Sequence, residues 1–550
     1  MKKFLSRFIK EVAVSIERFF TTFCLIIVLF LVNGYMVVFE PEAVVLQTMQ
    51  QIVLTLWLGI FFCTLGKMLF EKYGERIKIK RVFAEIGLVL LSALAYLALE
   101  GYENNPYIWS GYVGVIIAMF VGIVYTANTA GISKTFSYIF KNTVFNGLVC
   151  GIVYAGTALS IFAFQSLIYD FNDSYKVYAI AALLIWVVLF FNLSLSAIPR
   201  RDAELKIPNL FKAIVMYVGL PVYLLLIAIL YGYLGKILLA FNFPSGQVNW
   251  FASFASLMFI FFVLALEQYK DENKAAKVFV KFGGYAIIPI IVVQFIAMYI
   301  RLSNYGLTTS RYISLVLNIV ALVFAVVTFV KNGRYIKHML IAVICLSLLL
   351  TVTPLNIHDV PRWEQTARLT QVLQQNDMIE NGKIVAKDDI SQEDKITITS
   401  AYNYLDSYYF RDEKMPDIIV NTEREGFALI FGFAKEYEEN DWYNSSYNFY
   451  SYYNDVDVID IAGYSKLHKV YVHNDTMVSI QLGSGEPVSY NLTKDVEALY
   501  AEYGEVSYSD DVKMEFQVGA NKLILTHLGF EVDDNNEITI NSFEGYFLER

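Results

Sequence analysis

Residues that could carry out catalysis are few in this sequence and are scattered along it. Two of its five histidines, His468 and His473, are close in sequence but an odd number of positions apart. On one straight strand they would point to opposite faces, so this pair does not indicate a metal site. The chain has no His-Glu-x-x-His, Gly-x-Ser-x-Gly or phosphate-loop motif. We therefore predict no catalytic residue, no cofactor and no metal ion.

One aromatic segment could bind a ligand. Residues 442–453 contain seven aromatic side chains in twelve positions, with amide and hydroxyl neighbours. Exposed aromatic rings of this kind suit stacking on sugars, so the segment predicts a surface that binds cell-wall glycan. Aromatic residues also favour strands and cross-strand pairs, and they sit well at a membrane surface, so both structural alternatives stay open. The candidate binding residues are Trp442, Tyr443, Tyr447, Tyr450, Tyr452 and Tyr453.

A Tyr-Pro pattern occurs twice, 68 residues apart. Proline inside a membrane helix removes a backbone donor and kinks the helix. Two kinks at the same depth could frame a polar cavity, as in transporters built from repeats. The alternative is a chance match, because proline is common in membrane spans. The candidate kink and cavity residues are Tyr217, Pro221 and Tyr231 in the first copy, and Tyr285, Pro289 and Tyr299 in the second.

Composition divides the chain into two parts. It is 56% hydrophobic and only 17% charged, which is too apolar for an ordinary soluble protein. Residues 1–353 carry 28 Lys and Arg against 16 Asp and Glu, whereas residues 354–550 carry 15 against 36. A C-terminal part with this excess of negative charge repels nucleic acid. We therefore predict no nucleic-acid partner. We expect a polytopic α-helical membrane domain over residues 1–354 and a soluble acidic α+β domain over residues 355–550.

The apolar part predicts about eleven membrane spans. Alternate loops hold 24 and 4 Lys and Arg residues, a split that places the N-terminus in the cytoplasm. Eleven crossings then place the C-terminal domain outside the plasma membrane. The last run has a continuous apolar core only from Met339 to Val352, and without that crossing the domain would be cytoplasmic. The expected spans are 19–39, 46–66, 82–99, 110–127, 144–168, 177–198, 213–233, 250–268, 282–300, 312–330 and 337–353.

The span centres contain neutral polar residues but essentially no charge. A charged side chain in hydrocarbon is costly and usually functional, so its absence argues against a carboxylate-driven proton or sodium carrier. The neutral residues are expected to hydrogen-bond neighbouring helices. They are Gln165, Asn192, Gln294 and Asn318.

Several short elements form a recognisable set. They are Tyr305-Gly-Leu-Thr308, the pair Arg311-Tyr312, the proline-containing exit from the last span, Trp363-Glu-Gln-Thr-Ala-Arg-Leu369, Tyr231-Gly-Tyr233 and Pro244-Ser-Gly-Gln-Val248. Together they resemble an uncharacterised family of bacterial multi-pass membrane proteins, catalogued only as a domain of unknown function. The similarity covers most of residues 210–375, although Ser310 stands where the family pattern has Asn. The resemblance implies a bacterial envelope setting and carries over no catalytic residue.

Arg311 and Tyr312 lie on the predicted outer rim. By their position they are expected to contact lipid headgroups, and the alternative for Arg311 is an ion pair with the acidic domain.

The C-terminal part reads as helices followed by strands. Ser391-Gln-Glu-Asp394 has the form of a capping box that opens a helix, and a change to a period of two after residue 455 predicts strands. We expect helices at 361–375, from 391 and at 493–503, and strands at 456–461, 469–473, 477–482, 512–518, 522–528 and 537–540, with a hairpin turn at 474–476.

These patterns favour a non-enzymatic envelope protein that displays an outer sensing or binding domain. Its expected partners are the lipid bilayer and either cell-wall glycan or another envelope protein. One alternative is a transporter or lipid-handling channel that uses the proline-kinked spans. Another is a membrane-embedded transferase, for which Glu40, Glu42 and Asp359 are the outer-face carboxylates to test.

Overall fold

The computed structural model divides the chain into two units, which we treat separately: unit 1, Met1–Gln365, and unit 2, Thr366–Arg550. The division falls inside helix α15 (Asp359–Gln375), after the boundary at residues 354 and 355 predicted from composition. The structure describes residues 12–77, 81–103, 105–169, 171, 173–200, 204–240, 247–331, 336–409, 427–433, 435–436, 445–450, 461, 463–473, 476–482, 487–503, 508–509, 512–532 and 538–550.

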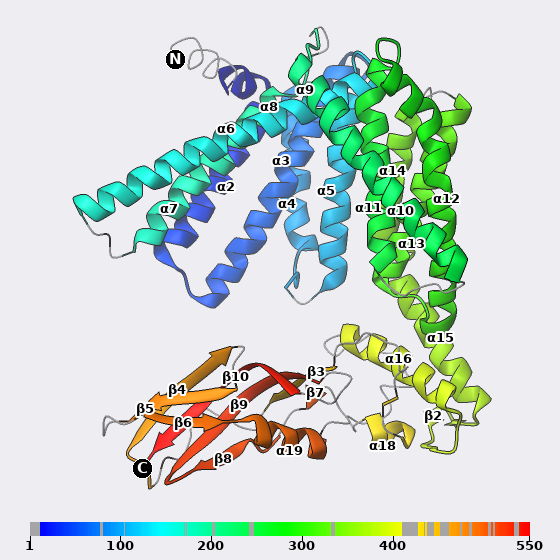
Figure 1. Cartoon of the computed structure of the whole chain (residues 1–550). Helices are drawn as coiled ribbons and strands as arrows, with labels where there is room; N and C mark the ends of the chain where they lie inside the picture. The colour runs from blue at the N-terminus through cyan, green and yellow to red at the C-terminus, as the bar shows by residue number, and fades with distance from the viewer. Residues whose placement is uncertain are drawn as a thin grey trace. The chain divides into compact units, whose positions relative to one another are not determined.

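Unit 1 is a helical bundle (Figure 1). An apolar segment in hydrocarbon must satisfy its own backbone hydrogen bonds, and a helix does this within the segment. The helices are α2 Phe20–Phe39, α3 Ala43–Ile77, α4 Arg81–Ala98, α5 Pro106–Thr126, α6 Ile132–Leu167, α7 Ser174–Ala182, η1 Leu183–Phe190, α8 Phe191–Ser196, α9 Asn209–Ala213, η2 Ile214–Gly219, α10 Leu220–Ala240, α11 Gln247–Leu266, η3 Glu267–Tyr269, α12 Lys274–Tyr305, α13 Thr309–Lys331 and α14 Ile336–Val352.

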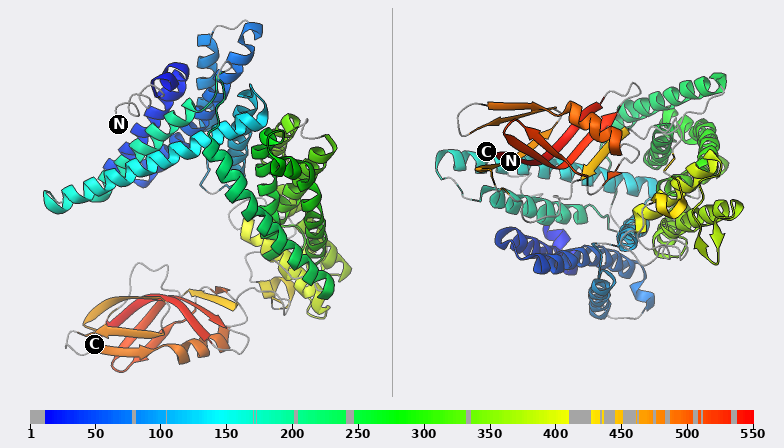
Figure 2. Two further views of the ribbon diagram at one scale, coloured as in Figure 1. Left: turned by 45° about the horizontal axis from the view of Figure 1, so that its top comes forward. Right: turned by 90° about the horizontal axis from the view of Figure 1, so that it is seen from below.

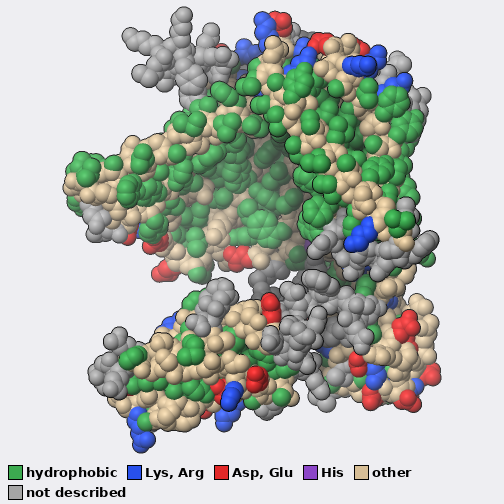
Figure 3. Space-filling view, viewed as in Figure 1, with side chains coloured by type: hydrophobic (Ala, Val, Ile, Leu, Met, Phe, Trp, Pro, Cys, Tyr) green, Lys and Arg blue, Asp and Glu red, His purple; other side chains and the backbone are tan. Residues whose placement is uncertain are grey.

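The helices confirm the predicted fold class. Nine described helices are long and apolar enough to cross a membrane, and two shorter apolar helices, Val82–Ala98 and Ile336–Val352, lie where the other two spans were expected. The chain is therefore a multi-pass membrane protein. On the face shown in Figure 3, hydrophobic side chains cover the middle of unit 1, and most of its Lys and Arg gather at the upper end.

Unit 1 contains two main hydrophobic cores. One is built from α10, α11, α12 and α13, and the other from α2, α3, α5, α6 and α8. Helix α6 runs alongside α7, which also contacts α2 (Figure 2). Helix α14 packs along α5, where the Thr351 side chain occupies the space that a Cβ at Gly114 would need. The short last helix is thus packed into the bundle along its length.

Unit 2 contains small helices and antiparallel sheets, and has two hydrophobic cores of its own. Its main sheet has the order β4-β10-β9-β3-β7, with β8 paired to β9, and its only parallel pair among the described strands is β3 with β7. The elements after α15 are β1 Ile379–Glu380, β2 Lys383–Ile384, α16 Gln392–Tyr409, α18 Phe427–Phe431, β3 Ser445–Tyr450, β4 Lys466–His473, β5 Met477–Gln481, β6 Pro487–Asn491, α19 Thr493–Tyr503, β7 Tyr508–Ser509, β8 Glu515–Val518, β9 Asn521–Val532 and β10 Ile538–Glu549.

Several local predictions for unit 2 are confirmed. Ser391 caps α16, because its Oγ accepts a hydrogen bond from the Asp394 backbone N–H at 3.1 Å. Helix α19 has the predicted bounds, and β8, β9 and β10 lie at the predicted strands, although β9 and β10 extend further. Most of the strand predicted at 456–461 lies outside the described residues.

The predicted hairpin at 474–476 is wrong. Strand β4 pairs with β10, and β5 pairs with β6. The alternation of residues identified both strands correctly, but it carries no information on which strand is the partner. Long-range pairing with the C-terminal strand places β4 in the main sheet.

Candidate functional site

The segment after the last apolar helix forms a hydrogen-bonded polar cluster within unit 1, which we call the junction cluster. It brings together three parts of the sequence: the start of α5, the loop between α12 and α13, and the connector from α14 to α15. Its members are Tyr107, Tyr305, Gly306, Leu307, Arg311, Asn356, His358, Asp359, Arg362, Glu364 and Gln365.

Asn356 organises the connector. Its Oδ1 accepts hydrogen bonds from the backbone N–H groups of His358 at 2.8 Å and Asp359 at 2.7 Å. Its Nδ2 donates to the Thr353 carbonyl at 2.9 Å. Asparagine commonly satisfies the unpaired donors at a helix start in this way. The helix begins at Asp359, two residues before the predicted start at Pro361.

Asp359 links this helix start to α5. Its Oδ1 accepts a hydrogen bond from the Tyr107 hydroxyl at 3.1 Å and forms an ion pair with Arg362 Nη2 at 3.0 Å. Its Oδ2 accepts from Asn356 Nδ2 at 2.7 Å. Of the transferase candidates, Asp359 is thus held by three donors, while Glu40 lies 3.3 Å from Lys176. The assignments of Glu40, Glu42 and Asp359 all stay predictions.

Two side chains of α15 hold the loop between α12 and α13 through hydrogen bonds to the backbone of that loop. Gln365, which is fully buried, donates from Nε2 to the carbonyls of Tyr305 at 3.0 Å and Leu307 at 3.2 Å. The Glu364 carboxylate accepts the Leu307 N–H at 2.7 Å. Gly306 has a φ of +67° and would place a Cβ 2.6 Å from Gln365 Nε2, so glycine is required there for both conformation and space.

The two outer-rim residues also lie at this loop. Arg311 donates from Nη1 to the carbonyls of Tyr305 at 3.2 Å and Gly306 at 2.7 Å, at the end of α12. The Tyr312 hydroxyl donates to the Leu355 carbonyl at 3.2 Å. A cation near the last carbonyls of a helix is favourable because of the helix dipole. Headgroup contact and pairing with the acidic domain both stay predictions.

The structure describes the residues of both copies of the Tyr-Pro pattern, on helices η2, α10 and α12. The side chains of Tyr217, Tyr285 and Tyr299 are 71%, 55% and 74% exposed. The Tyr231 hydroxyl, however, donates to the Ala286 carbonyl at 2.9 Å, in the same turn of α12 whose bonding Pro289 interrupts.

Pro221 is the second residue of α10, directly after the π-helical segment η2. A π segment is a common way to accommodate local disturbance of a helix. Tyr231 and Pro289 are therefore brought onto contacting helices, and the cavity itself stays a prediction.

The aromatic segment is described only in part. Trp442, Tyr443, Tyr452 and Tyr453 lie outside the described residues. Tyr447 and Tyr450 belong to β3, which pairs with β9 and with β7, but the structure does not describe their side chains. The strand alternative therefore holds for 445–450, and glycan binding stays a prediction. Among the described residues, no group of three His, Cys, Asp or Glu side chains could hold a metal ion.

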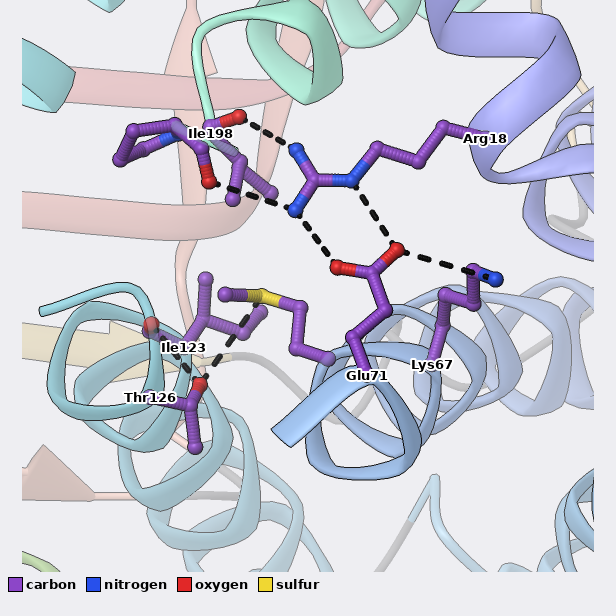
Figure 4. A network of polar contacts seen from close by, with 8 residues as sticks. Arg18, Lys67, Glu71, Ile123, Thr126 and Ile198 are labelled. Carbon is purple, nitrogen blue, oxygen red and sulfur yellow. Dashed lines mark hydrogen bonds and ion pairs between the residues drawn. The ribbon is translucent and has the colours of Figure 1, made fainter. Parts of the chain in front are cut away.

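A second polar network, at the other end of unit 1, was missed from sequence (Figure 4). The Arg18 guanidinium pairs with the Glu71 carboxylate through Nε at 3.2 Å and Nη2 at 2.9 Å. It also donates to the backbone carbonyls of Ile198 at 2.6 Å and Pro199 at 3.3 Å, just after α8. Lys67 adds a longer contact of 3.7 Å to Glu71.

This inner network joins a helix over residues 12–18 to α3 and to the end of α8. The Arg18 side chain is 9% exposed and that of Glu71 is 29% exposed. The partners are 53 and about 180 positions apart, so no local pattern could reveal them. The only hint of this network in the sequence was the position of Arg18, a cationic residue directly before the apolar run that begins at Phe19. A recess of about 10 Å³ beside it, lined in part by Thr21, Lys67 and Glu85, has room for about one water molecule.

The fold and these two networks define a multi-pass helical membrane protein that carries a C-terminal α+β region. A family model described as Domain of unknown function (DUF4153) matches residues 11–384, and the chain belongs to that family. The match includes the junction cluster and the inner network, and it extends the resemblance seen at residues 210–375 to the whole helical part. Comparisons with curated proteins and with solved structures found no match.

The inner network predicts strong coupling between Arg18 and Glu71. Replacing one member of a mostly buried ion pair leaves the other charge uncompensated, so Arg18→Met and Glu71→Gln should each destabilise the protein by roughly 2–4 kcal/mol. The double variant should cost clearly less than the sum. Arg18→Lys is the matched control for charge without the forked geometry. Thermal unfolding in detergent measures each step, and additive losses would contradict the coupling.

The junction cluster predicts a pH dependence. Burial lowers the pKa of His358 below its usual value, against smaller opposing effects of a hydrogen bond with the Pro106 backbone and the Asp359 charge. The His358 ring packs on Tyr107 at 4.8 Å, and Arg362 pairs with Asp359 in the same cluster. Above a pH of about 6.5 neither the folded nor the unfolded state protonates this histidine. Below it the unfolded state gains a proton first, so stability falls.

Acidification from about pH 7.5 to about pH 5.5 should therefore lower the unfolding temperature more in the wild type than in a His358→Gln variant. The difference between the two proteins isolates His358 from other titrating groups. An equal loss in both would show that His358 does not contribute.

Proposed function

We propose that this chain is an envelope protein whose helical bundle displays the C-terminal region outside the cytoplasmic membrane, where it senses or binds an envelope component. The observation that carries the proposal is the junction cluster. Three separate segments of unit 1 contribute to it, and Asn356, Glu364 and Gln365 of the exiting chain bond to backbone groups.

The charge distribution supports the outer location. Of the 28 Lys and Arg residues before residue 354, 24 lie in alternate loops on the side of the N-terminus. Cytoplasmic loops of membrane proteins carry such an excess. The packing of α14 along α5 supports a full eleventh crossing, although its 17 residues are few for a span.

The aromatic segment supplies the proposed ligand surface. Sugar rings stack on exposed aromatic side chains, and residues 442–453 include seven aromatic residues, of which Phe449 is buried in the core of unit 2. The net negative charge of the C-terminal part would disfavour anionic lipid surfaces, so a neutral or cationic envelope partner fits it better. Cell-wall glycan is the partner class that we propose.

The outer location is tested with single cysteines in a protein whose four native cysteines are replaced. Tyr471, which is 68% exposed in unit 2, and Lys206, whose side chain is 80% exposed, are each changed to cysteine. An impermeant maleimide should label Tyr471→Cys in right-side-out vesicles and Lys206→Cys only in inside-out vesicles. Labelling of Tyr471→Cys only in inside-out vesicles would place the C-terminal region in the cytoplasm and end the proposal.

Glycan binding is tested by sedimentation of the full-length protein in detergent with purified cell-wall sacculi. Trp442→Ala and Tyr443→Ala should reduce the sedimented fraction several-fold, because each removes a stacking surface. Tyr471→Ala, which removes an exposed aromatic side chain of unit 2, is the control and should bind as the wild type. Equal binding by all variants would rule out the aromatic segment as the ligand surface.

A further inference from the structure

Helices α11, α12 and α13 bury polar side chains in the middle of an apolar core. On α13, Asn318 lies on one stripe with Ala321, Ala325 and Thr328, which are at most 1% exposed. On α11, Ser256 is fully buried on the stripe that includes Ala252 and Phe259. The three helices contact one another, and their alanines belong to one hydrophobic core.

Ser253, Gln294 and Asn318 lie at nearly the same depth, and Ser256 lies about one helical turn, roughly 4.5 Å, further along α11 than Ser253. Helices α11 and α13 are parallel, because α12 runs back between them, and Phe259 meets Phe324 edge to face at 6.2 Å. Ser253 and Asn318 each lie six residues before this aromatic pair, about 9 Å along the helix axis. Gln294 of α12 reaches the same level, since its Nε2 donates to Ser253 Oγ at 2.8 Å. This bond confirms the expected cross-helix role of Gln294.

Asn318 and Ser256 have no such bond to the protein. Within the described part of the chain, neither amide atom of Asn318 nor the Ser256 hydroxyl has a hydrogen-bond partner, and both residues are 0% exposed. A buried polar group left in this state carries the full cost of losing its contact with water. Such groups in native proteins are usually satisfied by ordered water or a ligand.

The absence of charged residues around the site decides whether it suits a cation or a neutral molecule. Residues 250–266, 282–300 and 312–330 contain no Asp, Glu, Lys or Arg. A bare cation would lose its hydration without a compensating carboxylate, and ion desolvation costs far more than neutral side-chain oxygens return. Water satisfies a neutral amide and a hydroxyl at little cost, because it both donates and accepts. The site therefore suits a small neutral molecule.

We propose that Asn318 and Ser256 bind water inside the α11–α13 core, within about one helical turn of the Ser253–Gln294 hydrogen bond. This site is independent of the display function, because it uses no residue of the junction cluster or the aromatic segment. Bound water would then lie inside helices whose span centres contain no charged residue.

Hydroxyl-radical footprinting of the full-length protein in nanodiscs, in ¹⁸O-labelled water, tests the proposal. Radicals formed from bound water react with adjacent side chains, so Phe259 and Leu322, one turn from Ser256 and Asn318, should gain ¹⁸O despite lying in the core. The double variant Asn318→Leu/Ser256→Ala should lose this label several-fold. Absence of label in the wild type would overturn the proposal.

Thr328→Val is the matched control, since Thr328 is equally buried on α13 but donates to the Phe324 carbonyl at 2.6 Å. It should keep the wild-type label at both positions. The double variant should also unfold close to the wild-type temperature, because removing a satisfied polar group together with its bound water is nearly neutral. Equal labelling of the wild type and a folded double variant would show that the label does not come from water at these residues.

Discussion

The structure depends on one constraint: inside hydrocarbon, each segment must satisfy its own backbone hydrogen bonds. The apolar part is therefore helical, and its charged side chains lie near the ends of the spans. There a side chain such as Arg18 or Arg311 can bond to carbonyls that the helix itself no longer uses. The inner network and the junction cluster are two results of the same rule at opposite ends of unit 1. The first holds the N-terminal helices together, and the second holds the exit of the chain.

The two clusters differ in what holds them. The inner network depends on charge, through the paired fork of Arg18 and Glu71. The junction cluster depends mainly on side chains bonded to backbone, as in Asn356 and Gln365, with one ion pair at Asp359. A hydrogen bond from a side chain to the backbone fixes the direction of the chain more strongly than an ion pair between two flexible side chains. The reason is that its backbone partner has little conformational freedom to lose. This distinction is why we connect the junction cluster with function.

Sequence predicted what depends on local pattern. Span positions followed from apolar run length, the Ser391 cap from its spacing to Asp394, and the family from short elements such as Tyr305-Gly-Leu-Thr308. Contacts between distant segments could not be predicted. The Arg18–Glu71 pair, the Tyr107–Asp359 bond and the pairing of β4 with β10 join residues far apart in the chain. Periodicity assigns a residue to a face, but it does not name the neighbour on that face.

The central claim is that the start of α5 and the connector to α15 form one joint. In the cysteine-free protein, Tyr107→Cys and His358→Cys together should be joined by a short cross-linker with two thiol-reactive groups, such as a bis-maleimide, because the native rings are 4.8 Å apart. After cleavage of an intervening loop, the two fragments should then migrate as one species on a denaturing gel. Fragments that separate as completely as those of either single-cysteine protein would contradict the account.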